Sequence, residues 1–224
     1  MIRQELDFPK GLIPARPRLR GQARMMVVDR KTGARQHRSI LELPEFLLGD
    51  EVWANRSLAE GFDPELQPVY ASAPGSHASP TAGLPIPREL VDRLNVRTLT
   101  LHIGSPREQD DILKGYQTGL GWREWYQIPQ APAGRIAAIG TTVVKAFETW
   151  ARTGELTGWS RLFIQPPFEF KVIGKMLTNW HFPGEPLLAL TCAFGGVDVI
   201  REAYEAAVAE GYLFSDYGDR LLII

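Results

Sequence analysis

A four-residue apolar run, Ile136 to Ile139, passes through Gly140-Thr141-Thr142 into a stretch that ends at Gly154. The apolar run is too short for a helix and fits a buried strand, whereas the stretch that follows repeats its apolar residues at helical spacing. A strand that turns through glycine into an amphipathic helix is half of a β-α-β unit, the building block of parallel sheets. This segment therefore predicts an α/β fold.

Strands and helices also alternate in the rest of the chain. A turn at Lys31-Thr32-Gly33 separates two β-prone runs and predicts a hairpin. Further strands and helices are expected within residues 43–55, 87–94, 96–104, 122–129, 186–196 and 198–212, and a strand ends the chain. Residues 105–121 are polar and contain glycine, so a loop is expected there.

A segment rich in Pro, Gly, Ser and Ala, residues 58–79, divides the chain and predicts a linker or long loop. The domain organisation predicted from it is an N-terminal part of the core over 1–57, this loop, and a main ligand-binding portion over 80–224. Because the chain is 44% hydrophobic, it has enough apolar mass for a packed core.

Positive charge is concentrated at the N-terminus. Residues 1–40 carry ten Lys and Arg against three acids, which makes this segment +7 and the remainder −8. A basic face of this kind can contact the phosphate backbone of a nucleic acid. A solvated face that complements the acidic remainder accounts for the charge equally well.

The cysteine and histidine content argues against a metal site. The single cysteine, Cys192, lies in an apolar run and is expected to be a buried structural thiol, and the four histidines show no ligand spacing. No signal peptide or membrane-spanning run is evident, so we expect a cytoplasmic protein without a membrane partner. The sequence does not indicate an oligomeric state.

Two glycine-containing turns could hold a ligand. At Gly140-Thr141-Thr142, backbone amides at a helix start and two hydroxyls suit an anionic or polyhydroxylated group. Helix capping by either threonine is the alternative. The small residues from Pro80 to Leu84 let a ligand approach the backbone, although a plain loop-to-helix turn explains them as well.

Two histidines are candidates for acid–base chemistry. His102 ends a predicted strand, which is where ligands bind to open α/β sheets, and this position favours it as the base. His181 lies in Thr178-Asn179-Trp180-His181-Phe182-Pro183, which can hydrogen-bond a base edge or ribose and stack a ring. A purely structural role is the alternative for such a histidine.

Taken in order, these segments resemble the S-adenosylmethionine:tRNA ribosyltransferase-isomerases of queuosine biosynthesis. The similar segments are LDFPKGLIP, ARMMVVDRKTG, ASPTAGLPIP, TLTLHIG, EWYQIP, AAIGTTVVKAFE, FIQPPFEFKVI, LTNWHFP, LLALTCAFGG, AYEAAVAEGYLF and YGDRLLI. The resemblance implies the mixed α/β core of that fold. It also implies transfer and isomerisation of the ribosyl moiety of S-adenosylmethionine, as substrate, onto a 7-aminomethyl-7-deazaguanine base of tRNA, with release of adenine and methionine.

The resemblance implies a set of site residues. Because the sulfonium acidifies the neighbouring C5′ hydrogens, the reaction needs a positioned base and a water-poor pocket. The implied catalytic residues are His102, His181 and Glu124. The implied S-adenosylmethionine-binding residues are Asn55, Arg56, Pro80, Thr81, Ala82, Gly83, Leu84, Gly104, Gly140, Thr141, Thr142, Thr178, Asn179 and Pro183.

The chain also departs from the family pattern. The family's inserted β-barrel domain, near position 60, is replaced by a short loop, and Pro85-Ile86 stands where the family has His-Phe. Ser105-Pro106-Arg107 replaces Gly-Thr-Phe, and Trp122 takes the place of a histidine. These losses leave two alternatives open: an enzyme that uses S-adenosylmethionine with a small-molecule acceptor, or a non-catalytic nucleoside-binding remnant.

Overall fold

A nine-stranded mixed sheet forms the centre of the protein, in the order β10-β8-β7-β4-β9-β11-β13-β2-β3. The computed structural model describes residues 13–14, 20–59, 61, 63–104 and 109–224. The strands of the sheet are β2 (Arg24–Val28), β3 (Arg35–Ser39), β4 (Glu51–Asn55), β7 (Arg97–Leu101), β8 (Leu120–Gln127), β9 (Ile136–Ile139), β10 (Thr157–Leu162), β11 (Ile173–Asn179) and β13 (Arg220–Ile223). The α/β fold predicted from the sequence is confirmed.

The middle of the sheet is parallel. Strand β4 pairs in parallel with both β7 and β9, and β9 pairs in parallel with β11. Ile139 of β9 is opposite Leu177 of β11, so the residues that follow them, Gly140 and Thr178, lie side by side. The carboxyl ends of parallel strands share one edge of the sheet, and this edge is where α/β proteins bind ligands.

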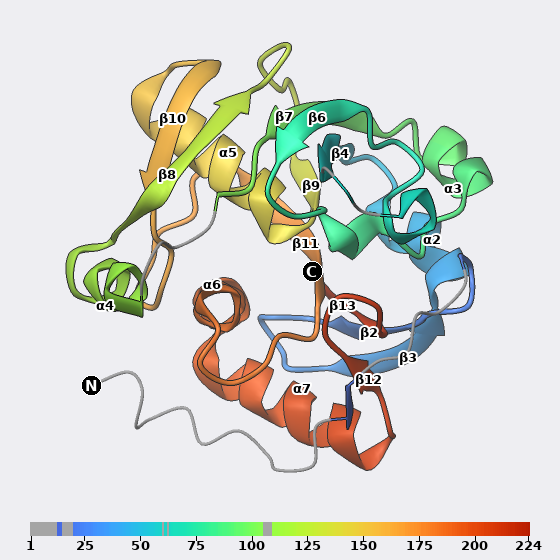
Figure 1. The fold of residues 1–224 in the computed structure, drawn as a ribbon. Helices are drawn as coiled ribbons and strands as arrows, with labels where there is room; N and C mark the ends of the chain where they lie inside the picture. The colour runs from blue at the N-terminus through green and yellow to red at the C-terminus, as the bar shows by residue number, and fades with distance from the viewer. Residues whose placement is uncertain (1–12, 15–19, 60, 62, 105–108) are drawn as a thin grey trace.

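Both faces of the sheet are covered, and side chains alternate between them. Met26 and Val28 belong to one hydrophobic cluster, whereas Met25 and Val27 belong to the other. The helices α5 (Thr141–Thr153), α6 (Pro186–Gly195) and α7 (Val197–Ala209) pack on the first face. The helices α2 (Leu43–Leu47) and α3 (Arg88–Arg93) cover the second (Figure 1).

The central helix α5 begins and ends where the sequence predicts. Its N-cap is Gly140, and its C-cap is Gly154, whose φ of 77° is the left-handed conformation that favours glycine. The predicted hairpin is also confirmed. Strands β2 and β3 are antiparallel, with Arg24 opposite Ser39 at one end and Val28 opposite Arg35 at the other.

The prediction of a loop over 105–121 is wrong, because residues Gln109–Thr118 form helix α4. Gly115 gave a misleading signal: a Cβ there would lie 2.4 Å from Cδ2 of Phe163, so the glycine permits close packing instead of a turn. The ring of Tyr116 packs edge-on against Phe163, with centroids 4.9 Å apart. Tertiary packing against Phe163 thus holds a helix whose own sequence is polar.

Short elements complete the described chain. The segment predicted as a linker contains β5 (Ser57–Ala59), η2 (Pro64–Leu66) and β6 (Ala73–Ser76), and β5 pairs with β6. The remaining elements are β1 (Ile13–Pro14), which pairs with β12 (Leu213–Phe214), and the 3-10 helices η1 (Ile40–Glu42) and η3 (Thr81–Gly83). Arg3, Lys10, Arg16 and Arg18, and the run 105–107, lie outside the described residues.

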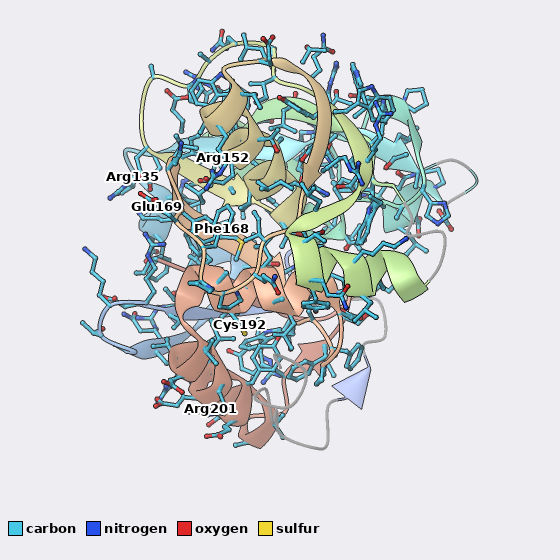
Figure 2. All side chains as sticks on the ribbon, turned by 90° about the vertical axis from the view of Figure 1, so that its left-hand side faces the viewer. Arg135, Arg152, Phe168, Glu169, Cys192 and Arg201 are labelled. Atoms are coloured by element: carbon cyan, nitrogen blue, oxygen red, sulfur yellow. The ribbon has the colours of Figure 1, made fainter. Side chains whose placement is uncertain are left out.

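The connection from β10 to β11 is fixed to helix α5. The buried carboxylate of Glu148 accepts hydrogen bonds from the backbone N–H groups of Lys171, Val172 and Ile173. The guanidinium of Arg152 lies 4.5 Å from the centroid of the Phe168 ring and donates to the carbonyl of Glu169, and the three residues group together in Figure 2. Among the described helices, none is long and apolar enough to cross a membrane.

Candidate functional site

A cavity of about 380 Å³ lies beside the carboxyl ends of β9 and β11, between the start of α5, the turn η3 and helix α6. Ten of the residues singled out from the sequence line it: Pro80, Thr81, Ala82, Glu124, Gly140, Thr141, Thr142, Thr178, Asn179 and His181. They come from four separate segments of the chain. The sheet topology therefore brings to one place side chains that the sequence could only suggest one by one.

The Gly-Thr-Thr turn faces this cavity and does not cap its helix with a side chain. Gly140 is the N-cap of α5, has φ 97°, and donates its N–H to the carbonyl of Leu177 at 2.8 Å. Neither threonine makes a capping hydrogen bond, and the buried hydroxyl of Thr142 has no partner among the described residues. The structure thus gives no support to capping and leaves Thr142 available to a ligand.

Asn179, the last residue of β11, joins this strand to two other segments. Its Nδ2 donates to Oγ1 of Thr81 at 2.9 Å and to Oδ1 of Asp216 at 3.0 Å. The hydroxyl of Thr81 also donates to Oδ1 of Asp216, at 2.7 Å. Asn179 is 5% exposed, and its Oδ1 has no partner within the described part of the chain.

His181 is buried in the cavity wall with both ring nitrogens close to polar groups. Its Nε2 lies 3.0 Å from Oγ1 of Thr178, and its Nδ1 lies 3.5 Å from Oε2 of Glu185. The side chain of His181 is only 6% exposed, whereas that of Glu185 is 45% exposed. This arrangement places the imidazole between a hydroxyl and a carboxylate, a position from which a histidine can exchange protons with a ligand.

A buried ion pair forms another part of the wall. The carboxylate of Glu124 contacts the ammonium of Lys145, and their side chains are 6% and 12% exposed. Glu124 also accepts from the N–H of Gly104 at 3.0 Å and from the indole of Trp122 at 3.1 Å. The same indole lies 5.4 Å from the Lys145 ammonium, so Glu124 and Lys145 are held rigidly at the cavity.

The η3 turn is held by a buried arginine. Arg220, on β13, is completely buried and donates to the carbonyls of Thr81 and Ala82 at 2.8 and 2.9 Å. Burial lowers the pKa of Arg220 to about 10. Gly83 is required in this turn, because a Cβ there would lie 1.7 Å from Oη of Tyr70.

His102, favoured from the sequence as the base, does not line this cavity. Its backbone N–H donates to the carbonyl of Trp125 at 2.9 Å, and its ring stacks on Trp125 with centroids 5.4 Å apart. Since a Cβ on Gly75 would lie 3.5 Å from the imidazole, the ring lies against β6. Burial lowers the pKa of His102, so the neutral form is favoured.

Asn55 and Arg56 also lie away from the cavity. The fully buried side chain of Asn55 donates to the carbonyl of Leu101 at 2.9 Å and accepts from the N–H groups of Leu101 and Ser57, both at 3.0 Å. The guanidinium of Arg56 donates to Oγ1 of Thr100 at 3.1 Å. Asn55 thus ties the ends of β4 and β7 together, and its hydrogen-bonding groups are used within the fold.

The remaining predicted residues support the site from behind it or lie outside it. Gly83, Leu84, Gly104 and Pro183 do not line the cavity. Gly104 acts through its N–H on Glu124, Leu84 is buried below the η3 turn, and Pro183 is exposed.

Sequence reasoning missed Ser79, Lys145, Glu185, Asp216 and Arg220. Lys145 could have been found, because it lies one helical turn after Thr141 and therefore on the same face of α5. Glu185 follows His181 by four residues, but helical spacing does not apply in the turn before α6. Asp216 and Arg220 carry no local signal, since only the sheet topology brings the C-terminal turn to η3.

The described residues contain no group of three or more His, Cys, Asp or Glu side chains suited to a metal ion. Cys192 is buried on α6 (Figure 2), and burial raises its pKa to about 12. A thiol with so high a pKa is protonated at neutral pH, which agrees with a structural role.

The sequence of the chain is similar to that of a known protein family. The family model described as "Queuosine biosynthesis protein" matches residues 52–223. An S-adenosylmethionine:tRNA ribosyltransferase-isomerase from Sulfurihydrogenibium is 39% identical over 177 residues, covering 70% of this chain and 52% of the relative. One from Acidithiobacillus ferrooxidans is 41% identical over 187 residues, covering 75% and 54%.

A solved structure is similar over almost the whole chain. The crystal structure of S-adenosylmethionine tRNA ribosyltransferase from Thermotoga maritima superposes with a TM-score of 0.70 at 26% identity, covering 97% of this chain and 98% of that one. The chain spans about half the length of the curated relatives it matches. Because the family model covers most of the sequence, from β4 to the last strand, this chain is a member of the queuosine biosynthesis protein family.

Proposed function

We propose that this chain is an S-adenosylmethionine-dependent tRNA ribosyltransferase-isomerase. In this reaction the ribosyl moiety of S-adenosylmethionine is transferred to a 7-aminomethyl-7-deazaguanine base of tRNA and isomerised, and adenine and methionine are released. The proposal draws on the names of the relatives and on one observation in the cavity. Three polar atoms of its lining residues, Oγ of Ser79, Oγ1 of Thr142 and Oδ1 of Asn179, are buried and have no partner among the described residues.

These three atoms fit a nucleoside. An unpaired buried polar group costs about 1–3 kcal/mol, so most buried polar groups in native proteins are paired with protein, water or ligand. The Ser79 hydroxyl and the Asn179 carbonyl suit the hydroxyls of a nucleoside, and the Thr142 hydroxyl suits a polar group attached to it. Apolar residues supply the water-poor surface that an adenine ring requires, namely Ile103, Leu162, Ile164 and Leu190.

His181 is the residue we assign as the base. When S-adenosylmethionine is bound, its sulfonium supplies acidic hydrogens at C5′. A neutral imidazole at His181 can take such a proton, and the nearby carboxylate of Glu185 stabilises the resulting positive charge. His102 is not assigned this role, because its ring stacks on Trp125 away from the cavity.

Lys145 and the start of α5 supply donors for an anionic group at the cavity. The first-turn amides of a helix and a lysine ammonium both favour an anionic group, such as an amino-acid carboxylate. Glu124 fixes the ammonium in place through their ion pair. We therefore assign Lys145, Thr141 and Thr142 to the methionine end of the substrate.

The N-terminal segment is proposed as part of the tRNA-binding surface because of its +7 charge. Several of its described arginines already have acidic partners: Arg24 pairs with Asp219, Arg35 with Glu202, and Arg38 with Glu42. We propose in addition that residues 58–79 occupy the place of the domain inserted in longer relatives.

The test is release of adenine from S-adenosylmethionine, measured by chromatography in the presence of tRNA that carries 7-aminomethyl-7-deazaguanine. We expect one adenine per modified tRNA and none with the same tRNA carrying guanine. His181→Gln should lower the rate about 100-fold or more, as expected for loss of a general base. His102→Gln, at a histidine whose ring stacks on Trp125 and does not line the cavity, is the matched control and should leave the rate unchanged.

Three outcomes separate the readings. Adenine release only with modified tRNA supports the proposal. Release with the free base but not with tRNA identifies an enzyme for a small-molecule acceptor. Binding of S-adenosylmethionine without adenine release, with any acceptor, identifies a nucleoside-binding protein and overturns the proposed reaction.

A further inference from the structure

A hydrogen-bond network at the rim of the cavity fixes which way the Asn179 amide points. An ionised Asp216 can only accept hydrogen bonds, and its Oδ1 accepts one from the Thr81 hydroxyl at 2.7 Å. Having donated its single proton, Thr81 can only accept from Asn179, at 2.9 Å. The NH2 of Asn179 must therefore face both residues, and its carbonyl oxygen must point away from them.

What remains is a set of unused acceptors at one side of the cavity. Asn179 is 5% exposed, and its buried carbonyl oxygen has no partner among the described residues. No described residue donates to the second oxygen of Asp216, although its first oxygen receives two hydrogen bonds. The buried hydroxyl of Ser79, also unpartnered there, lines the same cavity.

We propose that Asp216, Asn179 and Ser79 form a subsite that binds the vicinal hydroxyls of a ribose. Two acceptors on different side chains match two neighbouring donors on the ligand. An ammonium group also donates, but it would have to bring a positive charge out of water against the buried amide of Asn179, whereas hydroxyls are neutral. The Ser79 hydroxyl can donate or accept, as sugar hydroxyls do.

Other residues of the cavity wall offer donors instead of acceptors. The Thr142 hydroxyl, the Lys145 ammonium in its ion pair with Glu124, and the start of α5 present hydrogen-bond donors. An anionic substituent of a nucleoside bound with its sugar hydroxyls at Asp216 therefore finds its donors at Lys145 and the start of α5. The identity of the nucleoside as S-adenosylmethionine rests on the proposed function, whereas the diol subsite itself rests on the network of Asp216, Thr81 and Asn179.

The experiment measures by calorimetry the affinities of the wild-type protein and its variants for adenosine, 2′,3′-dideoxyadenosine and S-adenosylmethionine. The wild-type protein should bind adenosine about tenfold or more tightly than the dideoxy compound, as expected for hydrogen bonds to a charged acceptor. In Asp216→Asn this ratio should fall to about threefold or less, because the acceptor is lost. Asp198→Asn makes the same chemical change on α7, at a side chain 80% exposed, and should keep the full ratio.

A second variant guards against misfolding. Ser79→Ala removes a hydroxyl that no described residue uses, so its thermal unfolding should match wild type while the ratio still falls. S-methylmethionine, which has an ammonium but no ribose, is the competing probe. If Asp216→Asn weakens binding of S-methylmethionine and leaves the adenosine ratio intact, the subsite holds an ammonium and the proposal is overturned.

The remaining outcomes distinguish this inference from the proposed function. Binding of S-adenosylmethionine together with equal affinities for adenosine and dideoxyadenosine overturns the subsite alone. Diol-dependent binding of adenosine without binding of S-adenosylmethionine overturns the proposed function and supports the subsite. If none of the three probes binds at millimolar concentration, both are overturned.

Discussion

The buried guanidinium of Arg220 donates from Nε to the carbonyl oxygen of Ala82 at 2.9 Å, which ties the last strand to the η3 turn. The same side chain donates to the carbonyls of Thr81, Asp216, Gly218 and Asp219, at 2.8 to 3.1 Å. A cation that satisfies several backbone carbonyls at once holds two segments of the cavity wall in register.

Arg220→Met is expected to lower the free energy of unfolding by about 3 kcal/mol or more, because it leaves several buried carbonyls without donors. Urea denaturation measures this change. Arg201→Met, on the exposed surface of α7, should change it by less than about 0.5 kcal/mol. Equal stability of the two variants would show that water or neighbouring groups replace the guanidinium.

Gly83→Ala is expected to destabilise the protein by about 1–3 kcal/mol, because the added methyl overlaps the Tyr70 hydroxyl. Adding Tyr70→Phe should recover part of the loss, since the nearest atom goes but Cζ, 2.7 Å from the added Cβ, stays. Thermal unfolding of the single and double variants measures the recovery. Gly33→Ala is not a suitable control for steric overlap, because Gly33 has a φ of 72° and any side chain there would strain the backbone.

The buried pair of Glu124 and Lys145 should be strongly coupled. Either Glu124→Gln or Lys145→Met leaves one buried charge without its partner, and each is expected to cost about 2 kcal/mol or more. The double variant should cost less than the sum of the two, with a coupling of about 1–3 kcal/mol. Strict additivity in denaturant unfolding would mean that the two charges do not interact in solution.

Stability should depend on the protonation of His102. Since burial lowers the pKa of this group from 6.5, the unfolded chain binds its proton first as the pH falls, so stability is lost below about pH 6.5. His102→Gln removes that contribution and should flatten the pH dependence of unfolding between about pH 5 and 7. An unchanged slope would place the pKa of His102 at its ordinary value.

Much of the fold and part of the site could be predicted from the sequence. The strand, glycine turn and helix at 136–153 carry local signals that the structure retains, so this segment is where predicted. Helix α4 could not be predicted, because Phe163, distant in sequence, supplies its packing partner.

The site shows the same division between local and long-range information. Residues of conspicuous segments, such as Thr178 and Asn179, are lining residues. His102 was favoured because it lies at the end of a strand. Successive side chains of an extended chain point to opposite sides, so Ile103 lines the cavity and the ring of His102 does not. Asp216 and Arg220 depend on the pairing of β13 with β11 and β2, which no local pattern encodes.

The location of the substrate is tested most directly by a crystal structure of the protein with S-adenosylmethionine bound. We predict electron density in the cavity beside the β9–α5 turn, with the ribose hydroxyls within hydrogen-bond distance of Asp216 and Asn179 and the carboxylate toward Lys145. Density beside His102 and Trp125, or a cavity that holds only water at saturating ligand, would contradict this account.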